Sequence, residues 1–402
     1  PMKETLLSLA LLLGTLVPAA AQEEKPAAPG YQFTDTKVIP TTPVKDQHRS
    51  GTCWCFSTHS FLESEILKAG GEPMHLSEMW VVRNCLREKA IKYVRMHGEI
   101  NFAEGGAAHD VIHSISRYGI VPQEAYPGFN YGTEKPDFHE LSLVLRSYLD
   151  AVLKANKQSG KVLSTAWLRG YEALLDSYFG VKPETFVWNG REYTPESFRD
   201  ALPIRMEDYV DLGSYTHHPF YTSFVIEIPD NWLWGSMYNV PLEDMMRIVD
   251  NALAEGYTVA WGTDVSDKGF GGAKAVGVLP VADLNGMDGT EAARWSKLTA
   301  AEKEAALYKF DKPGKERTVT QEMRQEAFDN FDTTDDHGML IMGTATDQNG
   351  TQYFKVQNSW DVRPPYDGFY YFSRPFVELK TTSLTVNKKA IPSDIRKKLG
   401  IK

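Results

Sequence analysis

The spacing of apolar positions predicts helices through the first half of the chain. Residues 53 to 71 have a helical period and end at a Gly-Gly pair, which is typical of a helix and its stop. Residues 110 to 118 have the same period, and residues 139 to 179 repeat leucine at helical spacing. Residues 194 to 238 are rich in aromatics and turn residues and favour neither helix nor strand. The pattern therefore predicts a helical region followed by an irregular one.

The second half alternates helical and strand patterns. Five apolar residues between positions 245 and 253 form one helical face, and the strand-like residues 257 to 261 follow. Residues 282 to 330 are charged and mostly helical in pattern, and residues 338 to 360 contain two strand patterns around an Asn-Gly turn. The expected fold class is therefore α+β, with an antiparallel sheet near the end of the chain.

The N-terminal segment has the pattern of an export signal. A lysine precedes an apolar run over residues 6 to 17, and three consecutive alanines follow, as a signal peptidase requires. The run is too short to span a bilayer, and a buried helix is the alternative interpretation. We expect a signal peptide over residues 1 to 21, a flexible leader over 22 to 32, and a folded domain over 33 to 402. The protein would be periplasmic or secreted if the signal functions and cytoplasmic otherwise, without stable membrane insertion.

Charge and cysteine content narrow the function further. The 402 residues carry 43 lysines and arginines against 53 aspartates and glutamates, a net charge of −10, whereas nucleic-acid binding needs clustered positive charge. Three cysteines cannot form a disulfide framework, and an odd number leaves a thiol free unless it pairs between chains. Nucleic acid is therefore not an expected partner, and thiol chemistry is the strongest lead.

Cys53 stands at the N-terminus of the first predicted helix. A cysteine is a strong nucleophile only as the thiolate, and a helix N-terminus with a nearby imidazolium lowers its pKa from about 8.5 to between about 3.5 and 7.5. We expect His337 to supply that imidazolium. If residues 347 to 350 form the hairpin loop, Asn358 pairs with Met339, two residues from His337 and on the same face. The Asn358 side chain can then orient the imidazole ring.

Gln47 lies six residues before Cys53 in a turn. Its side-chain amide and the Cys53 backbone N–H can together stabilise an oxyanion that forms above the thiol. Losing one such donor costs roughly 2.7 to 4 kcal/mol of transition-state stabilisation. Gln47, Cys53, His337 and Asn358 are therefore the candidate catalytic residues.

Simpler interpretations apply to the other cysteines and histidines. An isolated free cysteine is more often a small buried hydrophobe, which we expect for Cys55 and Cys85, and a bond between these two remains open. Cys53, Cys55 and His59 lie within one and a half helical turns and cannot converge on a tetrahedral metal, so we expect no metal site. The histidines interpreted as ordinary polar residues are His109, His113, His217 and His218.

Two segments resemble the signatures of papain-like cysteine peptidases: PVKDQHRSGTCWCFS around Cys53 and VQNSW around Asn358. The spacing from Gln47 to Cys53 and the order Gln, Cys, His, Asn match the family. The resemblance implies a papain-like two-subdomain fold, with a helical half and an antiparallel sheet half. It also implies hydrolysis of peptide substrates by Cys53, His337 and Asn358, with no cofactor.

The resemblance assigns binding roles as well. It implies that Trp360 shields the hydrogen bond between the histidine and the asparagine from water. Gly105 and Gly106 resemble the edge along which a substrate backbone pairs, although a simple turn is the alternative. Glu104 beside them is a candidate ligand for a substrate amine, against the alternative of a solvated loop charge.

The spacing narrows the resemblance to one branch. The candidate histidine follows the candidate cysteine by 284 residues, about 140 more than in most papain-like peptidases. Expected helical insertions at about 133 to 238 and 282 to 330 account for the difference and resemble the bleomycin hydrolase or aminopeptidase C branch. This implies an aminopeptidase, often a hexamer, whose C-terminal arm lies in the cleft. Here the arm is about 386 to 402, and Lys402 would offer its carboxylate to the substrate amine.

Two other functions remain open from the sequence. An arm that does not reach the site would leave an open cleft, which is typical of an endopeptidase. A catalytically silent binding protein can also keep the scaffold, although the intact set of candidate catalytic residues argues against it. The sequence departs from the family at Asp361, where glycine is usual. Aspartate tolerates positive φ, so we expect the turn to be kept.

Overall fold

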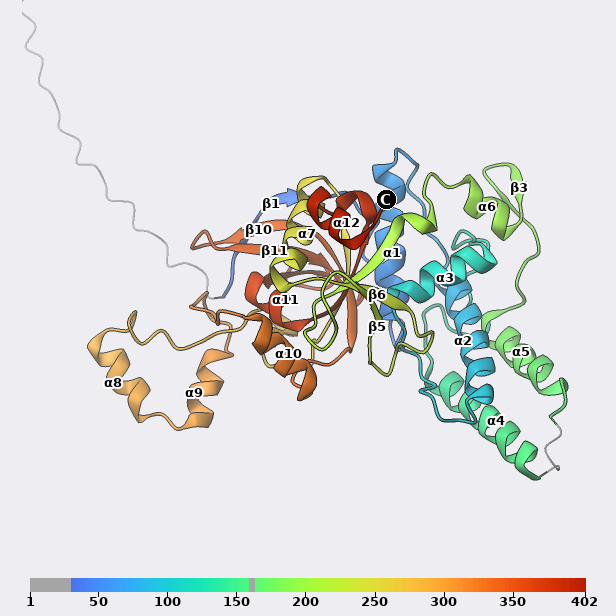
Figure 1. The fold of residues 1–402 in the computed structure, drawn as a ribbon, viewed down its shortest axis with the longest axis horizontal. Coiled ribbons are helices and arrows are strands. Elements are labelled where there is room, and N and C mark those ends of the chain that lie inside the picture. The colour runs from blue at the N-terminus through green and yellow to red at the C-terminus, as the bar shows by residue number, and fades with distance from the viewer. Residues whose placement is uncertain (1–29, 159–162) are drawn as a thin grey trace, which may run out of the picture.

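The fold has two halves that meet along one long helix. A computed structural model describes residues 30–158 and 163–402, so the predicted signal peptide and most of the predicted leader lie outside the described residues. Figure 1 shows the helical half on the right and the sheet half on the left. Within the described part of the chain, no helix is both long and apolar enough to cross a membrane.

Helix α1 (Cys53–Lys68) is the element shared by both halves. Its residues 54 to 66 are all buried, because α2 (Glu78–Arg95) and α3 (Ala108–Tyr118) contact it from one side and the sheet contacts it from the other. The helices predicted at residues 53 to 71 and 110 to 118 are confirmed. A helix that is buried all round holds its N-terminus in a fixed place relative to the sheet.

An 11-stranded sheet forms the other half, in the order β5-β6-β4-β13-β7-β10-β11-β12-β9-β8, with β1 also paired to β10. Two neighbouring pairs, β4 with β6 and β9 with β12, are parallel, and the other pairs are antiparallel. The strands are β1 (Phe33–Val38), β4 (Tyr209–Gly213), β5 (Ser223–Val225), β6 (Ser236–Asn239), β7 (Val259–Thr263), β8 (Phe270–Gly271), β9 (Val276–Gly277), β10 (His337–Asp347), β11 (Gln352–Gln357), β12 (Phe369–Ser373) and β13 (Thr381–Asn387). The α+β class with a helical half and a largely antiparallel sheet is confirmed.

The hairpin of β10 and β11 sets the position of the predicted asparagine. Near its turn Thr346 pairs with Gln352, one residue out of the predicted register, and a β-bulge between Ile341 and Gly343 restores it. Leu340 then pairs with Gln357, so Asn358 follows directly after the last pair. The asparagine therefore lies at the end of the hairpin where β10 begins.

The insertion at residues 133 to 238 contains both helices and strands. Helices α4 (His139–Gln158) and α5 (Ala166–Phe179) pack on α2 in the helical half, as predicted. A small hairpin, β2 (Phe186–Trp188) with β3 (Arg191–Tyr193), and helix α6 (Pro195–Ala201) follow. Strands β4, β5 and β6 then extend the main sheet beyond β13. These three strands fall almost entirely within residues 194 to 238, for which the sequence pattern favoured neither helix nor strand.

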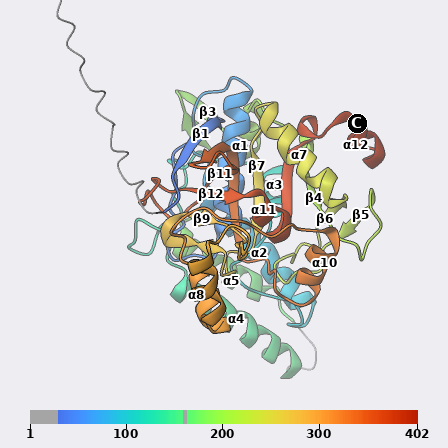
Figure 2. The same cartoon turned by 90° about the vertical axis from the view of Figure 1, so that its left-hand side faces the viewer.

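The insertion at residues 282 to 330 is mostly helical, as predicted. It contains α8 (Gly289–Lys297), α9 (Ala300–Leu307) and α10 (Gln321–Asp329). Neither α8 nor α9 has a buried residue, and both extend away from the sheet in Figure 1, whereas Figure 2 shows α8 in front of the molecule. Helix α10 packs on α11 (Arg374–Lys380) beneath the sheet. The part of this insertion nearest to the cleft is therefore its last third.

The C-terminal segment forms a short helix rather than an extended arm. Helix α12 (Ser393–Leu399) lies beside α7 (Leu242–Ala254) in both Figure 1 and Figure 2. Ile395 and Leu399 are buried in the same apolar cluster as the inner face of α7, and Arg247 pairs with Asp394 at 3.0 Å. These contacts explain why the segment stays on the outer face of the sheet half.

Candidate active site

A cleft of about 350 Å³ lies where the two halves meet. The helical half contributes the N-terminus of α1 and the Gly105-Gly106 segment, and the sheet half contributes the start of β10 and the end of β7. Six predicted site residues from distant parts of the sequence line it together: Gln47, Cys53, Gly105, Gly106, His337 and Trp360. The cleft is therefore the candidate active site.

Direct packing of β10 on α1 brings the histidine to the cysteine. A Cβ atom on Gly338 would lie 2.8 Å from Ser57 Oγ and 3.4 Å from the Cys53 carbonyl carbon, so only glycine allows this approach. The Gly338 backbone N–H also hydrogen-bonds the Cys53 sulfur. Since His337 directly precedes Gly338, it lines the same cleft as Cys53, the first residue of α1.

The histidine is held by the asparagine that the hairpin register predicts. His337 Nε2 lies 2.8 Å from Asn358 Oδ1, and the backbone N–H of Ser359 donates to the same oxygen. The indole of Trp360 packs against the imidazole with ring centroids 4.5 Å apart. His337 and Asn358 are both buried. The predicted hydrogen bond and the tryptophan beside it are therefore present in the structure.

Gln47 also lines the cleft and is held there by two hydrogen bonds. Its Nε2 donates to the Ser50 carbonyl at 2.8 Å, and its Oε1 accepts from Ser359 Oγ at 2.7 Å. These two bonds define the orientation of the amide and leave one of its two N–H groups for a ligand in the cleft. The backbone N–H of Cys53 has no acceptor within the helix, because it belongs to the first turn. Both predicted oxyanion donors are thus in reach of the cleft.

Burial controls the charges of the two reacting groups. It raises the pKa of the Cys53 thiol to about 12, although the N–H groups of Gly338 and Trp54 oppose the shift. It also lowers the pKa of His337 to about 4, against the favourable hydrogen bond from Asn358. Desolvation thus outweighs the lowering of the thiol pKa that the helix N-terminus led us to expect. A thiolate forms here only together with the imidazolium, by proton transfer that leaves the pair without net charge.

The glycine pair lines the cleft, but the adjacent glutamate does not point into it. Gly105 and Gly106 form part of the wall next to Cys53. The carboxylate of Glu104 accepts hydrogen bonds from the Gly51 backbone N–H at 2.5 Å and from the Ser142 hydroxyl. These hydrogen bonds stabilise the turn before α1. The interpretation of Glu104 as the ligand of a substrate amine is therefore wrong in this structure.

The expected C-terminal arm does not enter the cleft. Among the described residues, the lining includes none beyond Thr385 in β13. Lys402 is exposed and follows α12, which packs on α7. The apolar residues of α12 bury themselves against α7, so the structure does not bring Lys402 to the site.

Three carboxylates of the cleft were not among the candidate site residues, although Asp336, directly before His337, can be expected from the sequence to stabilise the imidazolium. Asp230 from the irregular region and the pair Asp335 and Asp336 before the histidine all line the cleft. Asp336 accepts a hydrogen bond from the Val265 N–H at 2.8 Å. The position of Asp335 and Asp336 immediately before the candidate histidine was the available indication. No local pattern indicated Asp230, since its place depends on contacts with distant residues.

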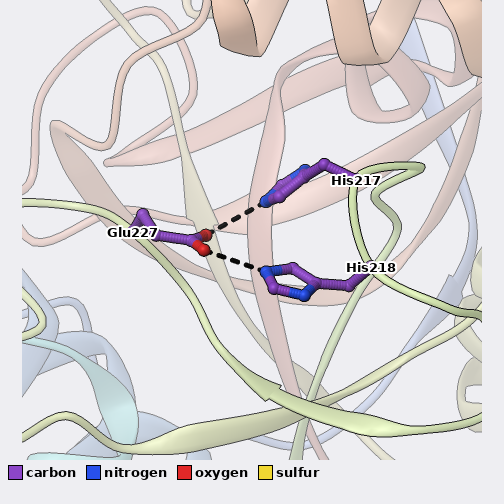
Figure 3. A group of neighbouring side chains, drawn as sticks. All are labelled: His217, His218 and Glu227. Carbon is purple, nitrogen blue, oxygen red and sulfur yellow. Dashed lines mark hydrogen bonds and ion pairs between the residues drawn. The ribbon is translucent and has the colours of Figure 1, made fainter.

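His217 and His218 have a partner that the sequence did not reveal. Both rings direct Nε2 at the Glu227 carboxylate, at 3.0 and 2.9 Å, as Figure 3 shows. Three such groups within 4.8 Å of one another can hold a metal ion. However, Gln325 donates an amide N–H to His217 Nδ1 at 2.9 Å.

That contact fixes the protonation of the His217 ring. The Gln325 amide orientation is set by two further bonds, from the Thr216 N–H to Oε1 and from Nε2 to Asp329. His217 Nδ1 is therefore an acceptor and its Nε2 carries the proton, which removes the lone pair that a metal would need. The group fits a hydrogen-bond network rather than a metal site.

The remaining predicted residues behave as structural groups. Cys55 and Cys85 are buried and not bonded to each other. Asp361 has a φ of 69°, so the turn after the asparagine keeps the left-handed conformation as expected. His109 is partly buried, and its ring nitrogens lie 2.9 Å from Asp211 and 3.0 Å from Asn231. It therefore has two polar partners that the sequence alone did not indicate.

Comparisons with known proteins agree with this geometry. Residues 31–166 match the papain family of cysteine proteases. Aminopeptidase C of Lactobacillus delbrueckii is 22% identical over 401 residues, covering 89% of this chain and 82% of the relative. Aminopeptidase C of Listeria monocytogenes is 21% identical, covering 94% and 87%. The crystal structure of PepW from Lactobacillus rhamnosis superimposes with a TM-score of 0.69 at 17% identity, covering 91% of this chain and 84% of that one.

Fold and cleft together define a thiol hydrolase built on the papain scaffold. The family match ends at residue 166, before His337 and Asn358, and it is the packing of β10 on α1 that joins these residues to Cys53. The chain matches the papain family of cysteine proteases over residues 31–166, and over most of its length it is similar to curated aminopeptidases C and G and to the PepW structure.

Proposed function

We propose that the protein is a cysteine aminopeptidase that hydrolyses the first peptide bond of substrates with a free N-terminus. The observation that carries the proposal is the contact of Gly338 with the first turn of α1, which sets His337 and its Asn358 partner beside the Cys53 thiol. The relatives named aminopeptidase C, G and W support the choice of an aminopeptidase. Peptides are accordingly the proposed substrates, with no cofactor.

The proposed mechanism begins with transfer of the thiol proton. Because Asn358 engages Nε2 of His337, Nδ1 is the ring nitrogen left to accept the proton of Cys53. The sulfur then attacks the substrate carbonyl carbon, and Gln47 and the Cys53 N–H stabilise the oxyanion. Collapse of this intermediate breaks the C–N bond, and the imidazolium protonates the leaving amine. Water, deprotonated by His337, then breaks the thioester and restores the thiol.

Substitution of the nucleophile tests this proposal. Cys53→Ala should abolish turnover of an aminoacyl fluorogenic amide without changing the circular dichroism spectrum, because the side chain makes no core contact that alanine would lose. Cys85→Ala is the matched control, since it removes a buried thiol away from the cleft and should retain turnover. Full activity in Cys53→Ala would refute the proposal.

A papain-like endopeptidase is the second candidate, and one observation favours it. Helix α12 lies on α7, and no described residue after Thr385 lines the cleft, so the arm does not close it. Comparing a free-amine aminoacyl amide with its N-acetylated counterpart separates the two. A preference for the acetylated compound would identify an endopeptidase.

We further propose that the chain is exported after removal of residues 1 to 21, on the signal-like pattern of that segment. N-terminal sequencing of the protein recovered outside the cytoplasm should find Gln22 first. Recovery of the intact N-terminus from the cytoplasm alone would contradict export.

The resemblance to the aminopeptidase C branch also supports a homo-hexamer as the assembled form. Light scattering coupled to size exclusion should then give six times the 45.2 kDa chain mass, less the removed segment. A monomeric mass at micromolar concentration would contradict this assembly.

A further inference from the structure

We propose that Asp230 and Asp335 together bind the α-ammonium group of the substrate and so select free N-termini. This inference rests on the proposed function and names the groups that confer its specificity. Asp230 comes from the loop between β5 and β6 and Asp335 from the segment before β10, and both line the cleft that contains Cys53.

Asp230 lies beside Gly105 of the Gly105-Gly106 segment. It belongs to the loop between β5 and β6, and a Cβ atom on Gly105 would lie only 1.9 Å from its Oδ2. Asn101 Nδ2 donates to its Oδ1 at 3.0 Å and so fixes the carboxylate. The Asp230 side chain is half-buried and lines the cleft. A substrate strand that pairs along Gly105 and Gly106 therefore meets this carboxylate.

Asp335 occupies the facing wall. It lies two residues before His337, and the hydroxyl of Thr382 in β13 donates to its Oδ1 at 2.6 Å. The fixed side chain leaves Oδ2 as the oxygen for a ligand. Because His337 acts on the scissile bond, a carboxylate at this position lies near the amine of the first substrate residue.

The charge of the lining favours a cation. It contains three carboxylates and no lysine or arginine. Burial and the neighbouring carboxylates of Asp230 and Asp336 raise the pKa of Asp335 to about 7. Burial also raises the pKa of Asp230, against the opposing charge of Lys89. An ammonium group between the two aspartates would relieve this repulsion.

The two nearby cationic side chains are hydrogen-bonded to groups other than Asp230 and Asp335. Lys89 donates to the carbonyl oxygens of Ala103, at 2.8 Å, and Gly105, behind the cleft wall. His109, whose charge also acts on Asp335, is held by Asp211 and Asn231. These bonds keep both groups from occupying the space between Asp230 and Asp335.

The position of Asp230 also limits substrate length. Because Asp230 Oδ2 would lie only 1.9 Å from a Cβ atom on Gly105, we expect a peptide that continues past Gly105 to meet this carboxylate. A chain that ends there in an ammonium group both fits the space and supplies the missing positive charge. The loop between β5 and β6 thus supplies what a C-terminal carboxylate would otherwise have to provide.

The test compares two substrates in matched variants. For Asp230→Asn and Asp335→Asn, kcat/KM for an aminoacyl fluorogenic amide should fall at least about tenfold, because each variant loses one ion pair of a partly buried ammonium. The value for the N-acetylated amide should stay the same or rise. Glu227→Gln is the control, since it removes the same charge nearby but outside the cleft and should change neither value.

Equal losses with both substrates, or no loss with either, would overturn the inference. If an asparagine variant fails to fold, the serine variant at the same position carries the test. A second measurement uses the alkylation rate of Cys53 by aminoacyl chloromethyl ketones, free and acetylated. The free-amine reagent should lose its advantage in both variants.

The outcomes separate this inference from the proposed function. Wild-type protein that cleaves neither substrate, or prefers the acetylated one, would refute the aminopeptidase proposal itself. Wild-type protein that prefers the free amine, with variants that keep this preference, would refute only the roles of Asp230 and Asp335.

Discussion

His337 Nε2 lies 2.8 Å from Asn358 Oδ1, so the asparagine selects which imidazole nitrogen is available to the thiol. The ring donates its Nε2 proton to the amide oxygen and keeps Nδ1 as the base. Trp360 packs against the ring with the two planes tilted by 32°, a position from which we expect it to limit access of water to the hydrogen bond. The chemistry of the cleft depends on this one contact between two adjacent strands.

Replacing the asparagine tests that dependence. Asn358→Ala should lower kcat by on the order of 10²-fold, because the ring loses its fixed tautomer and orientation. Asn358→Asp keeps an acceptor for Nε2 and should retain more activity, while its negative charge raises the pKa of His337. Steady-state kinetics and NMR titration of the histidine check both expectations. An unchanged kcat in Asn358→Ala would show that the contact is only structural.

The oxyanion donors give a second expectation. Gln47→Ala should reduce kcat by roughly 10² to 10³, with a smaller effect on KM, because the amide acts mainly on the charge of the transition state. Ser359→Ala is the matched comparison, since it removes only the hydrogen bond that holds Gln47 Oε1. It should cause a much smaller loss. Equal losses in both variants would assign Gln47 a structural role.

Activity should respond to pH differently for the two kinds of substrate. As pH falls through about 7, Asp335 takes up a proton and its attraction for an ammonium group disappears. The base His337 stays neutral until pH falls towards about 4. The kcat/KM profile of a free-amine substrate should therefore lose activity on its acid side near neutrality, and that of an acetylated substrate only at lower pH.

The Asp335→Asn variant isolates the cause of this difference. In this variant, kcat/KM for the free-amine substrate should no longer decrease near pH 7. Its pH profile should instead match that of the acetylated substrate. The groups that share the environment of Asp335 are Asp230, Asp336 and His109, and they are unchanged in this variant. A limb near pH 7 that persists in the variant would assign the titration to another group.

Glu104 offers a contrast to the cleft carboxylates. Its oxygens bond Gly51 and Ser142, so Glu104→Gln should weaken the turn before Cys53 and lower activity on free and acetylated substrates by the same factor. Differential scanning fluorimetry should show a lower Tm. A selective loss with the free-amine substrate would instead restore Glu104 as an amine ligand.

How far the sequence predicts this site depends on the range of the contacts involved. Helix α1 and the hairpin of β10 and β11 follow from local periodicity, and together they bring Cys53, His337 and Asn358 to the correct ends of their elements. Asp230 lies in a loop without a periodic pattern. Its approach to Gly105 is a tertiary contact between residues that are distant in sequence, which no local rule provides.

The C-terminal segment shows a different kind of failure. The apolar residues Ile395 and Leu399 are spaced by four, which is the spacing of one helical face. That spacing is typical of a short helix docked on an apolar surface, whereas the expectation of an arm in the cleft came from the family resemblance alone. The structure agrees with the helical spacing of Ile395 and Leu399 and not with the position that the family resemblance implied for this segment.

Truncation decides whether the arm contributes to specificity. Removing residues 400 to 402 leaves α12 and its buried contacts with α7 intact, so stability should change little. No described residue after Thr385 lines the cleft. The ratio of kcat/KM for the free-amine substrate to that for the acetylated substrate should therefore stay within about twofold of its value in the full-length protein. Deletion of the whole helix is the informative control, since exposing the apolar face of α7 should lower Tm while leaving that ratio unchanged. A ratio that collapses in the three-residue truncation would place the terminal carboxylate in the cleft and remove the need for Asp230.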